Sequence, residues 1–209
     1  SIDDLKRHYH QVVFTTGAQV DRNLGIPGED LSGSHSATDF VAWYNGHPDF
    51  ANLAFDLSQE SVAIVGVGNV AVDVARMLCR THEELKVTDM ADYATRALQN
   101  SKVKQVYMLG RRGPAQAAFT PPEIKELSEL ADADVIISVA EATLDAESRA
   151  DMDAGDDKNV QKNVQIIDDL AHRDQAGKRK SLTIRFLVSP TEILGKDGRV
   201  EAIRIARNS

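Results

Sequence analysis

Short apolar runs alternate with longer amphipathic stretches along the middle of the chain. Residues 61–66 are mostly β-branched and apolar, which is typical of a strand buried on both faces. Helical spacing follows over 69–80, and a second strand is predicted to end at Leu109. This order of strand, helix and strand predicts an α/β fold with a parallel sheet.

Further elements are expected on both sides of this unit. A short buried strand is predicted over 10–16, closed by Gly17, and a helix should follow that Ser36 or Thr38 caps and Gly46 stops. Two more helices and one more strand are predicted over 89–101, 121–130 and 134–138, respectively.

The last part of the chain carries the signal of a β-hairpin. The stretches 181–194 and 199–207 are joined by GKDG, a typical turn sequence, so we expect an antiparallel pair appended to the parallel sheet. In contrast, residues 145–158 are rich in carboxylates. Because their spacing does not fit a calcium-binding EF-hand, we expect a solvated loop there.

Composition narrows the classes of protein that need to be considered. The chain has 209 residues with a net charge of -8, and 42% of them are hydrophobic, so it can bury a core as one domain or slightly more. The acidic balance argues against nucleic-acid binding. Apolar stretches fall short of the roughly 20 residues that a membrane span needs, and the N-terminus lacks a signal-peptide pattern. We therefore expect a cytoplasmic protein.

Cysteine usage indicates a reducing compartment, and histidine usage argues against a metal site. The single cysteine, Cys79, lies in an apolar helical pattern and is interpreted as a buried core thiol in a reducing compartment. The six histidines show no metal-binding spacing, even where His8 and His10 could share a strand face. No metal site is expected.

The most informative motif is VAIVGVGNVAVDVA, at the first strand-to-helix corner. Gly66 suits the tight turn, Gly68 lets the backbone approach a pyrophosphate, and Ala71 is small enough for close packing of helix against strand. A helix that starts near Asn69 offers free N–H groups and the positive end of its dipole. Such a corner can also be only a sharp turn, but the strand, helix, strand context favours a dinucleotide site.

The end of the second strand favours NADP over NAD. An NAD site needs an acidic residue at that position, and Glu83 and Glu84 have nearly the right spacing but lie in a helical stretch. The strand is instead followed by Arg111 and Arg112, two cations suited to a 2'-phosphate. The alternative is that both arginines are solvated, or paired with Glu123 or another acid.

These motifs carry a resemblance to a known family. VAIVGVGNVAVDVARML and VYMLGRRGPAQAAFTPPEIKEL resemble the NADP domain of adrenodoxin reductase-type ferredoxin–NADP reductases, which are relatives of the glutamate synthase small subunit. Residues 12–50 and 184–207 resemble the segments that flank this domain. The resemblance covers nearly the whole chain and implies a Rossmann-like NADP-binding domain with a central parallel sheet and an appended antiparallel hairpin.

The resemblance also implies roles for individual residues. Arg111 and Arg112 would hold the 2'-phosphate, and Glu123 would contact the adenosine end of NADP(H). Val67 departs from the family pattern, because relatives often carry a polar residue there. The pyrophosphate would be held by the glycine-rich turn and the start of its helix, namely Gly66, Gly68, Asn69, Val70 and Ala71.

The family consists of flavoproteins in which NADPH passes a hydride to FAD and the flavin reduces a one-electron carrier such as ferredoxin. Residues 1–60 are interpreted as the segment that leads from the FAD domain, and 61–209 as the NADP domain with a hairpin returning toward it. Gly17 is expected close to FAD. Because no FAD fingerprint is found, the chain is interpreted as an excised, inactive fragment to which FAD itself does not bind.

Three other functions stay open at this stage. One is a glutamate synthase small subunit-type NADPH oxidoreductase domain, and another is a stand-alone NADP-sensing module without redox chemistry. The third is an interaction domain that has kept the fold and lost the ligand. The densest basic segment, 172–180, is a candidate docking site for an acidic ferredoxin, with a solvated turn before a strand as the alternative.

Overall fold

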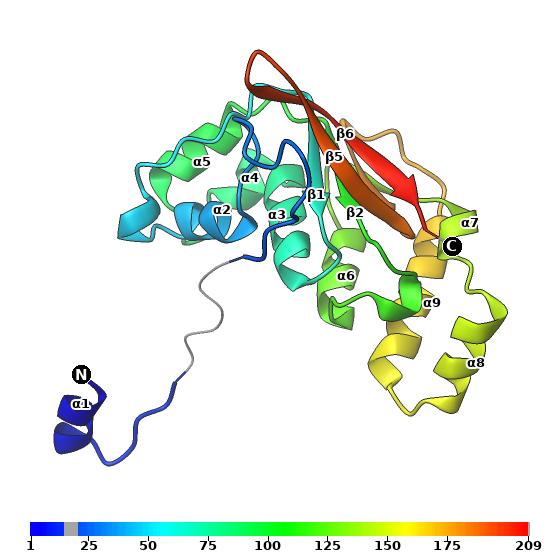
Figure 1. Cartoon of the computed structure of the whole chain (residues 1–209), viewed down its shortest axis with the longest axis horizontal. Coiled ribbons are helices and arrows are strands. Elements are labelled where there is room, and N and C mark those ends of the chain that lie inside the picture. The colour runs from blue at the N-terminus through cyan, green and yellow to red at the C-terminus, as the bar shows by residue number, and fades with distance from the viewer. Residues whose placement is uncertain (15–20, 209) are drawn as a thin grey trace.

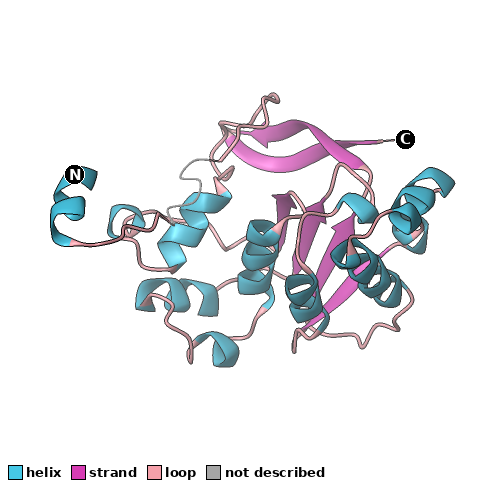
Figure 2. Cartoon of the chain, turned by 90° about the horizontal axis from the view of Figure 1, so that it is seen from below, coloured by secondary structure: helices cyan, strands magenta, loops and turns pink. Residues whose placement is uncertain are grey.

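The centre of the molecule is a parallel sheet. The computed structural model describes residues 1–14 and 21–208. In it, four strands are hydrogen-bonded in the order β1-β2-β4-β3, all parallel (Figure 2). They are β1 (Ser61–Val65), β2 (Gln105–Leu109), β3 (Ala133–Ile137) and β4 (Lys180–Arg185). The predicted α/β class with a parallel sheet is confirmed.

Helices cover this sheet and extend beyond it on both sides (Figure 1). Helix α3 contacts β1, β2 and β4, α9 contacts β3, and α6 lies between these two helices. The α-helices are α1 (Ile2–His8), α2 (Ala37–Tyr44), α3 (Asn69–Cys79), α4 (His82–Leu85), α5 (Asp92–Gln99), α6 (Pro121–Ser128), α7 (Val139–Ala142), α8 (Ala146–Ala154) and α9 (Lys158–Ala171). Short 3-10 helices are η1 (Pro48–Phe50) and η2 (Pro114–Gln116).

The predicted hairpin is present as a separate antiparallel pair. It consists of β5 (Val188–Lys196) and β6 (Arg199–Arg207) and forms its own layer beside the sheet (Figure 2). The loop before α2 is hydrogen-bonded to it: the Ile193 amide donates to the Pro27 carbonyl over 2.8 Å, and the Val200 amide donates to Ser32 over 2.9 Å. This contact joins the N-terminal segment to the C-terminal hairpin.

The core lies between the sheet and its helices. Val106 and Met108 of β2 and Leu182 and Ile184 of β4 are fully buried. Cys79 is also fully buried at the end of α3, as predicted. Because central parallel strands face covering elements, their inward positions are uniformly apolar.

Burial of the first strand differs from the prediction. β1 was expected to be buried on both faces, yet Ala63 and Val65 are exposed while Ile64 is buried. The reason is its place in the sheet: β1 is an edge strand, and among the described residues α3 covers only one of its faces. An apolar run alone does not distinguish edge strands from central ones.

The prediction of a strand over 10–16 is wrong for its described part. Residues 10–14 form no strand, and Val13 and Phe14 are 70% and 63% exposed. A strand needs a partner for its backbone, and residues 10–14 pair with none of the described strands. Gly17, predicted close to FAD, lies outside the described residues. His8 lies in helix α1, not on a strand.

Two predictions for the C-terminal half also need correction. The acidic segment 145–158 is largely helical, because the Asp145 carboxylate accepts the Ser148 amide over 2.7 Å and caps α8. The stretch 181–194 is not one strand: β4 joins the parallel sheet, the chain turns at Leu187, where φ is 55°, and β5 starts the hairpin. This one apolar stretch therefore contributes a strand to each of the two sheets.

Candidate nucleotide-binding site

The glycine-rich turn joins β1 to α3 as predicted. Gly66 has φ of +129°, a conformation that favours glycine, and a Cβ there would lie 3.9 Å from Cβ of Ala71. Gly68 is the N-cap of α3 with ordinary extended angles, φ -112° and ψ 178°. The turn itself therefore requires glycine at 66, whereas at 68 only an approaching ligand would require it.

The start of α3 leaves backbone donors available. Gly68 offers no side-chain cap, so the first-turn N–H groups have no partner from the cap residue. Val70, in this first turn, is 48% exposed. An open helix N-terminus that follows a glycine turn is suited to phosphate oxygens.

A neighbouring loop holds the glycine-rich turn in place. The Ala118 amide donates to the Val67 carbonyl, and the Thr120 amide donates to Oδ1 of Asn69, each over 2.9 Å. The Asn69 side chain thus fixes the loop that leads into α6. Sequence reasoning missed Ala118 and Thr120, although they lie in the motif that carried the resemblance.

The two arginines lie at the same edge of the sheet as this turn. β1 and β2 are in register with Val65 opposite Leu109, so both strands end together. Arg111 and Arg112 are exposed, and neither guanidinium has an ion pair or side-chain hydrogen bond within residues 1–14 and 21–208. The alternative pairing with Glu123 is not formed. Two cations are thus available to an anion beside the glycine turn.

Glu123 has an incomplete hydrogen-bond arrangement in the first turn of α6. Its Oε2 is shielded from solvent and has no hydrogen-bond partner among the described residues. A carboxylate oxygen in that state costs free energy until a donor approaches. A ribose hydroxyl or an adenine amine is a donor of the right kind, so this residue fits a nucleotide. NADP(H) therefore fits the donors and acceptors of this edge.

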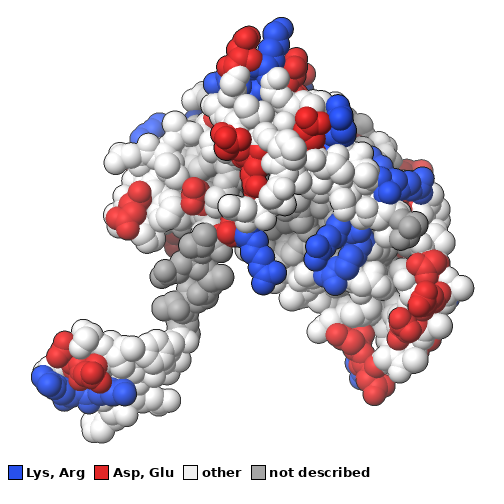
Figure 3. Space-filling model, viewed as in Figure 1, with Lys and Arg blue, Asp and Glu red and all other residues white. Residues whose placement is uncertain are grey.

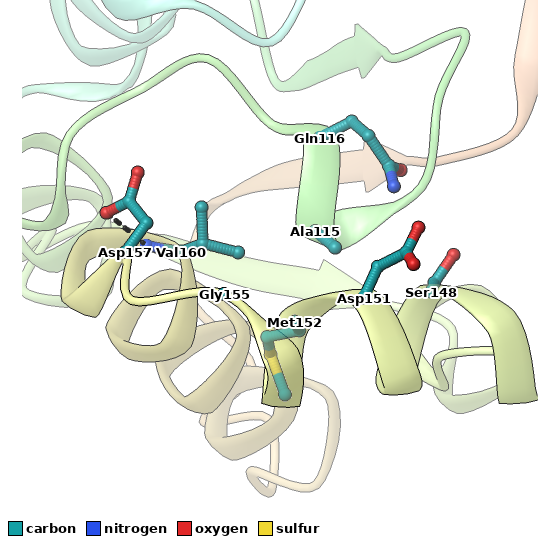
Figure 4. A pocket seen from close by; sticks show the side chains of 8 residues that line it. All are labelled: Ala115, Gln116, Ser148, Asp151, Met152, Gly155, Asp157 and Val160. Atoms are coloured by element: carbon teal, nitrogen blue, oxygen red, sulfur yellow. Dashed lines mark hydrogen bonds between the residues drawn. The ribbon is translucent and has the colours of Figure 1, made fainter.

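One cleft is lined in part by Ala115 and Gln116, which follow the predicted arginines in the chain. It measures about 180 Å³ and lies between η2, α8 and α9, where Ser148 and Asp151 point toward the segment of Gln116 (Figure 4). None of the residues predicted to bind the nucleotide lines it. The glycine turn and the arginines therefore form an open edge that is separate from this cleft.

Charge is unevenly distributed over the face of the molecule that Figure 3 shows. Basic side chains lie near its middle, whereas acidic ones gather over α8 (Figure 3). The separate basic segment 172–180 leads into β4, which begins at Lys180, and lies at the amino ends of the strands. There, Lys178 Nζ donates to the Leu130 carbonyl over 2.6 Å and Lys180 Nζ donates to the Leu78 carbonyl over 2.7 Å. Because two lysines of the segment are already hydrogen-bonded within the protein, these contacts favour a turn before a strand over a docking site for ferredoxin.

Among the described residues, no group of three or more His, Cys, Asp or Glu is placed to hold a metal ion. None of the described helices has the length and apolar character that crossing a membrane requires.

A parallel sheet with a glycine-rich β1–α3 turn and an open helix N-terminus defines a Rossmann-like dinucleotide-binding domain. No protein-family model matches the chain. It is 43% identical over 205 residues to the NADPH-ferredoxin reductase FprA of Mycobacterium tuberculosis, an alignment that covers 98% of this chain and 44% of FprA. It is 52% identical over 128 residues to the mitochondrial NADPH:adrenodoxin oxidoreductase of Arabidopsis thaliana, covering 61% and 26%.

Comparison with solved structures also finds FprA. The solved structure of FprA from Mycobacterium tuberculosis in complex with NADPH superposes with a TM-score of 0.87 at 41% identity, covering 100% of this chain and 45% of that one. The chain is therefore similar, over nearly its whole length, to part of the adrenodoxin reductase-type ferredoxin–NADP reductases, as the sequence resemblance indicated. It spans a little under half the length of FprA.

Proposed function

We propose that this chain binds NADP(H) and supplies the nucleotide-binding part of a flavin-dependent reductase. The observation that carries the proposal is the pair of exposed guanidiniums of Arg111 and Arg112 beside the glycine-rich turn, without a protein partner among the described residues. NADP(H), which carries both a pyrophosphate and a 2'-phosphate, uses both features.

Each part of the edge has a distinct task in this proposal. The pyrophosphate lies against Gly68 and the N–H groups of Asn69, Val70 and Ala71, where the helix dipole also favours an anion. Arg111 and Arg112 hold the 2'-phosphate, and Glu123 accepts a hydrogen bond from the adenosine end. When bound, NADPH supplies reducing equivalents, and this chain's own residues contribute binding and orientation.

The remainder of the reaction lies outside these residues. The similarity to FprA and to the adrenodoxin oxidoreductase supports a flavin as the acceptor from NADPH and a ferredoxin-type protein as the final electron carrier. Residues 1–60 and the hairpin would then connect to an FAD domain, in a protein of the cytoplasm. The glutamate synthase-type and nucleotide-sensing alternatives share the NADP site and differ only in what lies beyond it.

Titration with NADP⁺ and NAD⁺ tests the nucleotide assignment. Arg111→Ala and Arg112→Ala should each weaken NADP⁺ binding by about tenfold, since a charge-assisted hydrogen bond contributes roughly 1.5 to 3 kcal/mol and exposure lowers it. NAD⁺ lacks the 2'-phosphate, so its affinity should not change. Arg96→Ala, which removes an exposed arginine from α5, is the matched control. Equal weakening of both nucleotides, or of neither, would refute the assignment.

A further inference from the structure

The backbone of the arginine pair is held by the crossover between the two sheets. The Gly110 amide donates to the Arg185 carbonyl over 2.8 Å, and the Val188 amide donates back to the Gly110 carbonyl over 2.9 Å. The Leu187 amide donates to the Arg112 carbonyl over 3.2 Å. The segment that leads from β4 to β5 therefore sets the course of the loop after β2.

Asn208 completes this arrangement from the far end of the hairpin. Its Nδ2 donates to the Arg111 carbonyl over 2.7 Å and to Ser189 Oγ over 2.9 Å. Its main-chain amide donates to the Leu187 carbonyl over 2.7 Å. Because a carbonyl oxygen can only accept, the orientation of the carboxamide is fixed by its contact with Arg111.

These bonds form a closed ring around a strained residue. Leu187 has φ of 55°, an uncommon conformation for a residue with a branched side chain. Its amide is bonded to Arg112 and its carbonyl to Asn208, whose side chain returns to Arg111. Strained backbone of this kind persists where the surroundings hold it from several sides.

We infer that Asn208 is a positioning residue for recognition of the 2'-phosphate. It does not reach the nucleotide itself: it holds the main chain of Arg111, so that the guanidinium starts from a fixed point beside the glycine turn. The inference rests on the proposed function, because Asn208 acts through Arg111. It also means that the end of β6 is connected to NADP selectivity, although 97 residues separate Asn208 from Arg111 in the chain.

Nucleotide titration of Asn208→Ala tests the inference. Loss of one hydrogen bond to the arginine loop should weaken NADP⁺ binding by about three- to tenfold and leave NAD⁺ binding unchanged. Ser189→Ala is the matched control, because it removes the other acceptor of the same carboxamide and leaves the contact with Arg111 in place. The control should bind NADP⁺ within about twofold of the parent chain. An equal loss in both variants would mean that Asn208 only stabilises the hairpin.

A double-mutant cycle separates this inference from the proposed function. If Asn208 acts through Arg111, the double variant Asn208→Ala, Arg111→Ala should bind NADP⁺ no more weakly than Arg111→Ala alone. Fully additive effects would overturn the positioning role. If Arg111→Ala and Arg112→Ala leave NADP⁺ binding unchanged, the proposed function fails first. If they weaken it while Asn208→Ala does not, only the present inference fails.

Discussion

The amide of Gly66 donates a hydrogen bond to the carbonyl of Leu109 over 2.9 Å. This bond extends the pairing of β1 with β2 by one residue beyond Val65, into the glycine-rich turn. The glycine turn and the arginine loop therefore start side by side at one edge of the sheet. In the proposed function, a single dinucleotide reaches both.

The two glycines of the turn should respond differently to alanine. Gly66→Ala forces a side chain into φ of +129° and should lower the free energy of unfolding by about 1 to 3 kcal/mol. Gly68→Ala meets only the Cβ of Ala118, at 3.9 Å, so stability should not change. It should instead weaken NADP⁺ and NAD⁺ alike, because its methyl group lies where the pyrophosphate approaches. Urea unfolding and titration of both variants would show the contrast, and unchanged binding in Gly68→Ala would count against a pyrophosphate at this turn.

Replacing Glu123 should separate nucleotide affinity from stability. Its shielded, unpartnered Oε2 contributes nothing favourable to the nucleotide-free fold, so Glu123→Ala should unfold at the same urea concentration as the parent chain or a higher one. Affinity for NADP⁺ should fall by about tenfold, because a hydrogen bond to a charged acceptor is lost. Lys125→Ala, which removes an exposed side chain two residues further along α6, is a suitable control. A clear loss of stability without loss of affinity would assign Glu123 to the fold instead.

The buried thiol should be inert in the native protein. Burial raises the pKa of Cys79 to about 12, so almost no thiolate is present at pH 8. A thiol-specific reagent should therefore modify Cys79 only after denaturant is added. Rapid labelling of the native protein at pH 8 would contradict the burial of this residue.

The same shift has a consequence for stability at high pH. Because the folded pKa lies above that of an unfolded cysteine, the contribution of Cys79 is complete below about pH 8.5 and declines as the pH rises toward 12. The difference in unfolding free energy between the parent chain and Cys79→Ala should thus shrink from pH 8 to pH 10.5. Taking the difference cancels the titration of groups that do not interact with Cys79.

The pair formed by Glu141 and Arg185 should be important for stability. Glu141 is 5% exposed and accepts from Arg185 Nε at 2.9 Å and Nη2 at 2.8 Å, and also from the buried amide of Phe186 at 3.0 Å. Glu141→Ala leaves these donors without their acceptor. We expect the free energy of unfolding to fall by about 2 to 3 kcal/mol. This loss is small for a broken buried ion pair, because the Arg185 side chain is partly exposed.

Chemical denaturation of Glu141→Ala and Glu141→Gln would check this. The glutamine variant keeps an acceptor for Phe186 and should lose less than the alanine variant. Equal stability of all three proteins would show that the pair is replaceable by water.

Much of the site was determined by the sequence itself. The β1–α3 turn depends on residues only a few positions apart: an apolar strand, Gly66 at a positive φ, and a helix that Ala71 allows to pack closely. Local steric and hydrogen-bonding preferences are visible in such short stretches. The place of Arg111 and Arg112 just after a strand is equally local, and the structure agrees with it.

Only the tertiary structure decided which segments meet. Residues 181–194 were expected to form a single hairpin strand, yet β4 lies between β2 and β3 in the parallel sheet. In that place its backbone is hydrogen-bonded to a strand on each side. The contact of Asn208 with Arg111 and that of Glu141 with Arg185 span 97 and 44 residues. Such contacts form because folding brings complementary donors and acceptors together at buried or strained positions, and no periodicity or local propensity in a single sequence records which distant partner will be there.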